Sequence, residues 1–215
     1  MEDVAKIFSS IPVKVIFDVG ANEGQTAVKF LEHFPQGTVY SFEPFSEAFE
    51  KIKTVSSCSR FVPVNLALGE AVAAKKLFLT KYSLTNSLLP PDAQAQKFLG
   101  DCVESAGENL INMTTLDAFC LERRISKIDL LKLDTQGYEL NVLRGAESLL
   151  VSKSIKMILT EVNFVPLYEN QAFFHEVYQK LWNHGFRLVS LYDQEYRAGN
   201  CLNWCDALFV REDGF

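Results

Sequence analysis

The chain has 215 residues, 48% of them hydrophobic and 22% charged, which suits one sizeable α/β domain. A net charge of −6 argues against a nucleic-acid partner, because phosphate backbones are bound through an excess of Lys and Arg. No apolar run approaches the ~18 residues of a membrane span, and no basic segment precedes a long apolar one, so we expect a cytoplasmic protein, or a module of a longer one, with no membrane partner. Five scattered cysteines without a C-x-x-C pair predict reduced thiols.

The first part of the chain alternates apolar runs with amphipathic segments. The predicted elements are a lead-in helix at 1–12, strands at 13–19, 38–42 and 60–68, and helices at 25–34 and 46–55. Ser46 is the predicted N-cap of the last of these helices. Strands that alternate with helices indicate a mostly parallel sheet with right-handed crossovers.

Residues 70–110 break this alternation. Residues 76–80 alternate like an antiparallel strand, but most of the remaining segment lacks a clear period. A short strand at 111–114 and a helix at 115–121, capped by Thr115, follow it. Irregular insertions near strand ends often cover active sites, and we expect this role here.

Regular order returns after the insertion. The predicted elements are strands at 128–133, 155–160, 186–192 and 206–211, and helices at 138–150 and 172–182. No helical pattern separates the last two strands, so they should pair antiparallel. We expect a single domain over residues 1–215.

The most informative stretch is 15–45, where an apolar run, a turn, a helical pattern and a second apolar run follow in order. Gly20 and Gly24 mark the turn, Asn22 stands between them, and Glu43 ends the second run. This order of strand, turn, helix, strand and acid is typical of a nucleotide-binding site in an α/β sheet.

Details of the turn favour S-adenosylmethionine (SAM) over a dinucleotide. Asn22 stands where a dinucleotide fingerprint has a second Gly, whose missing side chain lets the backbone approach a pyrophosphate. SAM has no phosphate, but it carries an ammonium, a carboxylate and a cationic sulfonium. We expect Asp18 near the ammonium, free backbone N–H groups of the turn at the carboxylate, and Glu43 at the ribose hydroxyls. The alternative is a plain strand–helix turn with Asn22 as a helix N-cap.

Six motifs in this order together resemble the FkbM family of SAM-dependent methyltransferases over residues 13–212. They are DVGANEGQT, SFEPF, NLALG, TTLDAF, IDLLKLDTQGYELNVLRGAESLL and ILTEVNF. The resemblance implies a class I methyltransferase fold, a three-layer α/β sandwich whose seven-stranded sheet is parallel except for the last strand. It also implies O-methylation of sugar-like or polyketide hydroxyls. Carried over by motif, the SAM contacts are Asp18, Gly20, Ala21, Asn22, Glu43, and Asn65 to Ala67 near the adenine. Where the family commonly has Glu, this chain has Gln136.

Acids at the ends of two later strands predict the acceptor chemistry. Asp134 and Glu161 end strands that should be neighbours, and ligands of open α/β sheets lie beyond the carboxyl ends of the strands. Either carboxylate can orient an acceptor hydroxyl or take its proton, and positioning supplies much of the acceleration. His175 is a third candidate, as a general base. The structural alternative for Asp134 is an N-cap of the 138–150 helix.

Three alternatives stay open at this point. Asp134, Glu161 and Asn163 carry oxygen ligands that suit Mg²⁺, although we predict no metal site. An NAD-dependent reductase or epimerase is disfavoured by the absence of G-x-G-x-x-G and of Tyr-x-x-x-Lys. A non-catalytic SAM-fold module that recruits a partner is the third. The favoured prediction is a SAM-dependent methyltransferase that acts on a hydroxyl of a small or sugar-like acceptor.

Overall fold

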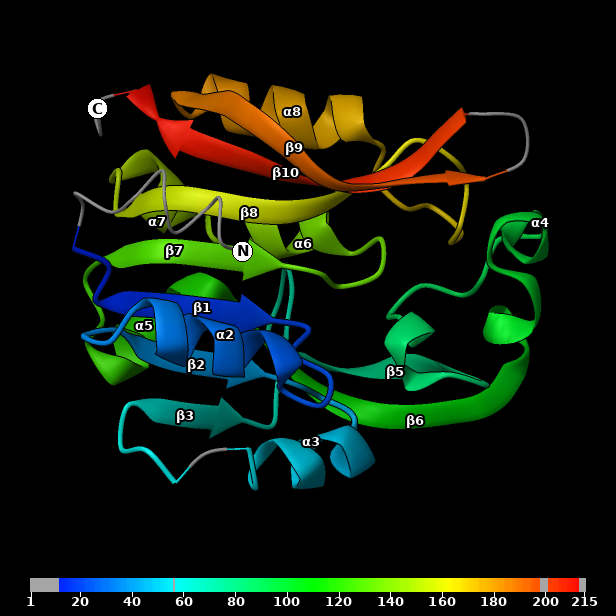
Figure 1. The fold of residues 1–215 in the computed structure, drawn as a ribbon, viewed down its shortest axis with the longest axis horizontal. Helices are drawn as coiled ribbons and strands as arrows, with labels where there is room; N and C mark the ends of the chain where they lie inside the picture. The colour runs from blue at the N-terminus through cyan, green and yellow to red at the C-terminus, as the bar shows by residue number, and fades with distance from the viewer. Residues whose placement is uncertain (1–11, 56, 198–200, 213–215) are drawn as a thin grey trace.

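A computed structural model describes residues 12–55, 57–197 and 201–212 of the chain. The helix predicted at 1–12 therefore lies outside the described residues, except for Pro12, which is not helical. Seven strands form one sheet in the order β3-β2-β1-β7-β8-β10-β9 (Figure 1). The strands are β1 (Val15–Val19), β2 (Thr38–Phe42), β3 (Phe61–Val64), β7 (Ile128–Leu133), β8 (Ile155–Asn163), β9 (Phe186–Arg197) and β10 (Cys201–Arg211). β10 pairs antiparallel with β8 and β9, whereas the other pairs are parallel, which confirms the predicted sheet.

Helices cover both faces of this sheet. The helices are α2 (Gln25–His33), α3 (Ser46–Ile52), α5 (Leu116–Arg123), α6 (Glu139–Arg144), α7 (Glu147–Val151) and α8 (Phe174–Asn183). The apolar side chains of α2 and α3 belong to one core, and those of α5, α6, α7 and α8 belong to a larger core. The result is the predicted three-layer sandwich (Figure 1).

The third predicted strand, 60–68, is divided between two sheets. β3 stays in the main sheet, but β4 (Ala67–Leu68) pairs with β6 (Ser105–Thr114), which in turn pairs with β5 (Ala73–Thr80). Asn65 lies at the division, where its Nδ2 donates to the carbonyl of Glu43 at 2.8 Å. β6 is longer than the predicted 111–114 strand. The prediction missed its first six residues because they are exposed and show no apolar alternation.

The insertion lies beyond the carboxyl ends of β1, β2 and β7 (Figure 1). It also contains the short helices η1 (Ser83–Thr85), α4 (Ala95–Leu99) and η2 (Gly100–Val103). Backbone hydrogen bonds from Asp92 to Leu167 and from Glu169 to Pro90 tie it to the loop after β8. The insertion is thus attached to the edge of the sheet at which we expect ligands. In the described part of the chain, no helix is long and apolar enough to cross a membrane.

The predicted helix at 138–150 is two helices, α6 and α7, and the chain bends between them at Gly145. A Cβ at Gly145 would lie 1.9 Å from the carbonyl oxygen of Gly69. Close contact between the two backbones therefore requires glycine at this position. Asp134 does not cap this helix, because α6 begins after Tyr138 without a side-chain cap hydrogen bond.

Of the two predicted N-cap residues, only Thr115 makes a capping hydrogen bond, and a pair of substitutions should show the difference in stability. Thr115 Oγ1 accepts the backbone N–H of Ala118 at 3.0 Å, as predicted. The Ser46 prediction is wrong, because Phe45 is the N-cap and makes no side-chain cap bond. We expect Thr115→Ala to lower the free energy of unfolding by about 1 kcal/mol, and Ser46→Ala by less than about 0.5 kcal/mol, in urea titrations. Equal losses would contradict this assignment.

Candidate active site

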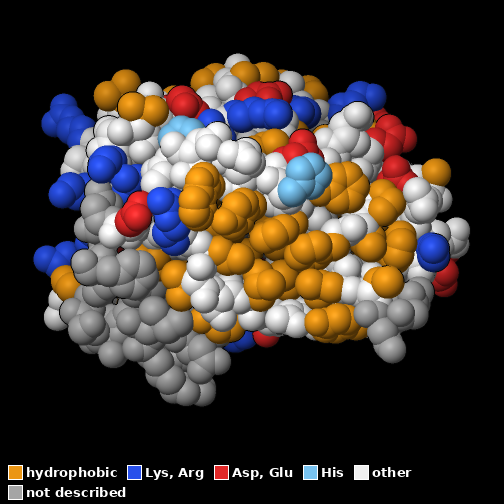
Figure 2. Space-filling model, turned by 90° about the horizontal axis from the view of Figure 1, so that it is seen from above, with side chains coloured by type: hydrophobic (Ala, Val, Ile, Leu, Met, Phe, Trp, Pro, Cys, Tyr) orange, Lys and Arg blue, Asp and Glu red, His pale blue; other side chains and the backbone are white. Residues whose placement is uncertain are grey.

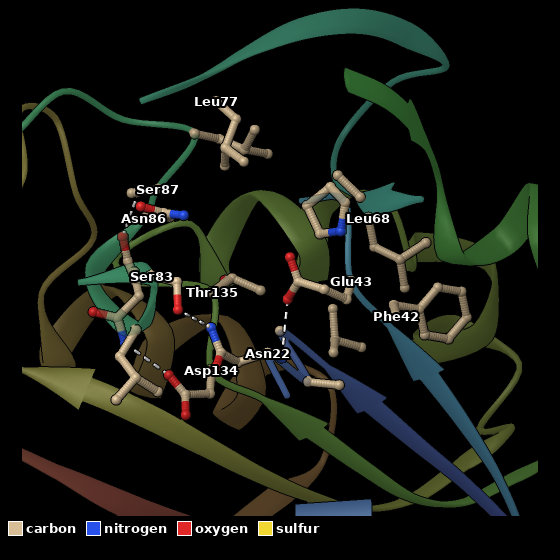
Figure 3. Close-up of a pocket in the computed structure, with 18 of the residues that line it drawn as sticks. Asn22, Phe42, Glu43, Leu68, Leu77, Ser83, Asn86, Ser87, Asp134 and Thr135 are labelled. Carbon is tan, nitrogen blue, oxygen red and sulfur yellow. Dashed lines mark hydrogen bonds between the residues drawn. The ribbon is translucent and has the colours of Figure 1, made fainter. Parts of the chain in front are cut away.

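One cavity opens at the carboxyl ends of β1, β2 and β7, and we call it the central pocket (Figure 3). Its empty volume is about 890 Å³ when the open solvent at its mouth is included. The predicted site residues that line it are Gly20, Ala21, Asn22, Glu43, Ala67 and Asp134. Residues from the turn between β1 and α2 and from the end of β7 therefore meet in one place, although they are far apart in the sequence.

The glycine turn is shaped by close contact with the end of β7. Gly20 has a φ of +79°, and a Cβ there would lie 1.8 Å from the carbonyl oxygen of Asp134. Gly20 and Ala21 both donate their N–H groups to the carbonyl of Phe42, at 3.1 and 3.0 Å. The expectation that these groups are free for a carboxylate is therefore wrong.

The first turn of α2 supplies other donors. Gln25 and Thr26 of this turn line the central pocket. The first N–H groups of a helix have no intrahelical acceptor, and the N-cap of α2, Gly24, brings no side chain to satisfy them. Asn22 is not the N-cap; it lies two residues earlier with a φ of 46°, a left-handed conformation that Asn tolerates. A carboxylate fits this helix end.

Glu43 directly follows β2, and its carboxylate lies against the glycine turn. Its oxygens accept the backbone N–H groups of Asn22 at 2.9 Å and Phe45 at 2.8 Å. Each carboxylate oxygen can accept a further hydrogen bond, so the group can still take two ribose hydroxyls. Burial raises the pKa of Glu43 to about 7, despite these two hydrogen bonds.

The raised pKa of Glu43 predicts that ligand affinity depends on pH. Below about pH 7 the free carboxyl holds its proton, and a ligand whose hydroxyls donate to the carboxylate must displace that proton. We expect the affinity for S-adenosylhomocysteine to fall as the pH drops through 7, by up to about tenfold per pH unit, in calorimetric titrations.

The control is Glu43→Gln, which keeps the shape of the side chain but does not titrate. This variant should bind about 1–3 kcal/mol more weakly at pH 8, where the charge-assisted bonds are lost. It should also show a flatter pH dependence. An unchanged pH dependence in the variant would show that Glu43 is not responsible.

Lys132 lies among the acids of the site. Its Nζ donates to Asp134 Oδ2 at 3.0 Å and lies 3.7 Å from Asp18 Oδ1. The register of β1 on β7 places Asp18 directly opposite Lys132. Burial alone would lower the pKa of Lys132, but the two carboxylates outweigh burial and raise it. Lys132 therefore remains a cation in the wall of the pocket.

Asp134 is held on both of its oxygens. Lys132 donates to Oδ2, and Gln136 Nε2 donates to Oδ1 at 2.8 Å. Gln136 is itself fixed, because its Oε1 accepts from the Tyr168 hydroxyl at 2.8 Å and its carbonyl accepts from Ser87 Oγ at 2.7 Å. Asp134 thus presents an oriented carboxylate to the central pocket.

Four of the predicted residues do not line the central pocket. The buried Asp18 contacts Lys132 and lies 3.5 Å from Ser41 Oγ, so it supports the pocket wall and does not face a ligand. Asn65 holds the end of β2 through the carbonyl of Glu43. His175 is exposed on α8, where its ring stacks on Phe173.

Glu161 is the fourth, and it lies within β8, not after it. Burial and the neighbouring carboxylates of Asp134 and Glu139 raise the pKa of Glu161 well above its ordinary value. Glu161 is therefore placed among other carboxylates and away from the wall of the central pocket. Among the predicted acids, only Asp134 combines an ionic partner with a place in the pocket wall.

Sequence reasoning missed two features of the site. Lys132 is two residues before Asp134, which directly follows the strand of Lys132, and this spacing could have shown that both side chains share a face. Glu139 accepts the N–H groups of Thr135 and Gly137, so it shapes the turn after β7. Residues 83–88 of the insertion also line the pocket in part; the polar run at 85–87 among them suits contact with a polar substrate or a simple turn.

The described residues give no metal centre. Nowhere in them do three or more His, Cys, Asp or Glu side chains form a group that could hold an ion. Asn163, the third ligand considered for Mg²⁺, is buried at the end of β8, and its side-chain amide has no hydrogen-bond partner in the described residues.

Comparisons with known proteins agree with this geometry. The chain is 26% identical over 168 residues to the 2-O-methyltransferase NoeI of Sinorhizobium fredii (strain NBRC 101917 / NGR234), covering 74% of this chain and 68% of that protein. It is 27% identical over 204 residues to the 31-O-demethyl-FK506 methyltransferase FkbM of Streptomyces tacrolimicus, covering 85% and 76%.

Solved structures share the fold at low sequence identity. The methyltransferase FkbM from Methylobacillus flagellatus KT superimposes with a TM-score of 0.57 at 13% identity, covering 93% of this chain but only 44% of that one. A putative S-adenosylmethionine-dependent methyltransferase from Listeria monocytogenes gives a TM-score of 0.56 at 8% identity, covering 98% and 97%.

The strand order, with a pocket at the carboxyl ends and an acid after the second strand, is that of a class I SAM-dependent methyltransferase. Within this class, the methyltransferase FkbM domain matches residues 18–188. The chain therefore belongs to the FkbM family of SAM-dependent methyltransferases.

Proposed function

We propose that the protein methylates the oxygen of a hydroxyl on a small or sugar-like acceptor, with SAM as donor and Asp134 as the acid–base group. Two relatives with O-methyltransferase names, at 26% and 27% identity, support transfer to oxygen. The observation that carries the proposal is the Asp134 carboxylate, oriented by Lys132 and Gln136 in the wall of the central pocket.

The residues of the central pocket fit the donor by their chemistry. Glu43 can accept ribose hydroxyls, the first turn of α2 offers N–H groups to a carboxylate, and Leu66 and Leu68 give an apolar wall. When bound, SAM supplies a methyl group that its sulfonium already activates. The carboxylates that line the pocket, Glu43 and Asp134, suit a cationic ligand.

Asp134 handles the proton of the acceptor. As the new oxygen–methyl bond forms and the sulfur–methyl bond breaks, the hydroxyl loses its proton to the carboxylate, which returns it to solvent. Lys132, a buried cation, donates to Asp134 Oδ2 at 3.0 Å and so holds the orientation of this carboxylate. Residues of the 70–110 insertion, such as Leu77 and Leu88, cover the pocket and exclude water.

The test is methyl transfer from isotopically labelled SAM to a panel of hydroxyl, amine and carbon acceptors, with Mg²⁺ or with a chelator. We expect label in an ether linkage that survives acid and base, and equal rates in both conditions. Label only in amines or in carbon acceptors would contradict the proposal. Binding of SAM without transfer to any class of acceptor would favour the partner-recruiting alternative.

A further inference from the structure

Residues 77–88 of the insertion form part of the wall of the central pocket, and Asn22 of the glycine turn donates from its Nδ2 to Ser83 Oγ at 3.1 Å. Ser83, Asn86 and Leu88 line the pocket there, together with Leu77 of β5. Figure 3 shows the side-chain amide nitrogen of Asn86 directed into the cavity. None of the residues expected from the motifs to contact SAM belongs to the insertion.

The orientation of the Asn86 amide is fixed by its partners. Its Oδ1 accepts the backbone N–H of Thr80 at 2.9 Å and the Thr80 hydroxyl at 3.3 Å. A backbone N–H can only donate, so the atom that faces Thr80 must be the oxygen. Ser87, the next residue, is bonded to Phe78 through both backbone groups, which holds Asn86 in place.

Asn86 Nδ2 has no hydrogen-bond partner in the described parts of the chain, although it lies in a half-buried position. An amide nitrogen carries two donor hydrogens. Both are therefore available to an oxygen or nitrogen acceptor of a bound molecule. A fixed, unpaired donor in a pocket wall is well suited to recognition, because little side-chain entropy is lost when it binds.

The charges of the pocket limit what that molecule can be. Lys132 is the single cation among the described residues that line the pocket, and Asp134 and Asp18 already neutralise it. Glu43 and Asp134 contribute carboxylates to the same wall. A phosphate or carboxylate on the acceptor would find repulsion here, with no unpaired cation among these lining residues to offset it.

We propose that Asn86 is a specificity-determining residue whose Nδ2 donates to an oxygen of the acceptor, and that the acceptor is uncharged where it enters the pocket. The inference rests on the proposed function and deepens it. An ether, carbonyl or second hydroxyl oxygen beside the reacting hydroxyl would accept the bond. Leu77 and Leu88 would contact the apolar edge of the same molecule.

Asn86→Asp is a closely matched test. The substitution keeps an oxygen for the Thr80 N–H and replaces the Nδ2 donor with a carboxylate oxygen that can only accept, so the turn should stay folded. The probes are methyl glycosides of neutral hexoses and deoxyhexoses, with hexose 6-phosphates and hexuronic acids as their anionic counterparts. The wild type should methylate neutral probes and none of the anionic ones. The variant should show at least a tenfold higher KM for the neutral probe, with kcat and S-adenosylhomocysteine affinity within about twofold.

Four results would overturn the inference. In the variant, they are an unchanged acceptor KM, or a loss of S-adenosylhomocysteine affinity as large as the rise in KM, which would assign Asn86 to the SAM site. In the wild type, they are transfer to anionic probes, or transfer to none of the neutral probes. Failure of the proposed function would look different, because the wild type would then transfer methyl groups to no oxygen in the wider panel.

Discussion

Replacing Asp134 with Asn should lower the rate of methyl transfer by about 10²–10⁴-fold, the range of general acid–base contributions. The amide cannot take the proton of the acceptor hydroxyl, although it has almost the same shape as the carboxylate. S-adenosylhomocysteine carries no sulfonium charge, so its affinity should stay within about threefold. Single-turnover transfer from labelled SAM, with an acceptor found in the panel, measures the effect.

Glu161→Gln is the matched comparison. Glu161 lies outside the central pocket and its pKa is raised, so its loss should change the transfer rate much less than Asp134→Asn does. Transfer that is unaffected by Asp134→Asn would remove this carboxylate from the mechanism. A larger effect of Glu161→Gln would reassign the base.

The second large effect concerns stability. Lys132→Met should lower the free energy of unfolding at pH 7 by about 3–5 kcal/mol, because it leaves the buried Asp18 carboxylate and the half-buried Asp134 carboxylate without their cation. Asp18 is fully buried, and without Lys132 its remaining described contact is Ser41 Oγ at 3.5 Å. Chemical unfolding, followed by circular dichroism, measures the loss.

The pH dependence of this loss has a definite sign. Burial already raises the pKa of Asp18, and removal of Lys132 raises it further. A raised folded-state pKa means that the folded state holds a proton that the unfolded state has released, so stability falls as the pH rises. The variant should therefore be closer to the wild type at pH 5 than at pH 8. Lys132→Met combined with Asp18→Asn should recover part of the loss; a double variant no more stable than the single one would contradict this pairing.

The fold could be predicted where burial is uniform. All six residues of β7 are buried, and four of them are apolar (Ile128, Leu130, Leu131 and Leu133), so the strand can be recognised in the sequence despite Asp129 and Lys132. β6 could not be predicted in full, because its exposed first half is stabilised by pairing with β5 and not by an apolar face. The division of the predicted 138–150 helix into α6 and α7 depends on the close approach of Gly69 to Gly145. The sequence around Gly145 does not indicate this contact, because Gly69 is remote in the chain.

The site could be predicted where it lies at strand ends. Gly20, Glu43 and Asp134 are in the pocket because each follows or ends a parallel strand. Asp18 and Asn65 also lie at strand ends. However, the Asp18 side chain is buried beside Lys132 of the neighbouring strand, and the Asn65 side chain donates to the carbonyl of Glu43. Such orientations depend on neighbouring strands that are remote in the sequence, and the same is true of the insertion that positions Asn86.

The central claim is that the pocket between the glycine turn and Glu43 binds SAM, and calorimetry with S-adenosylhomocysteine and with NAD tests it most directly. We expect binding of S-adenosylhomocysteine at about micromolar affinity, equal with and without Mg²⁺, and no heat from NAD. Glu43→Gln should weaken that binding. Binding of NAD, or of neither ligand, would contradict the account.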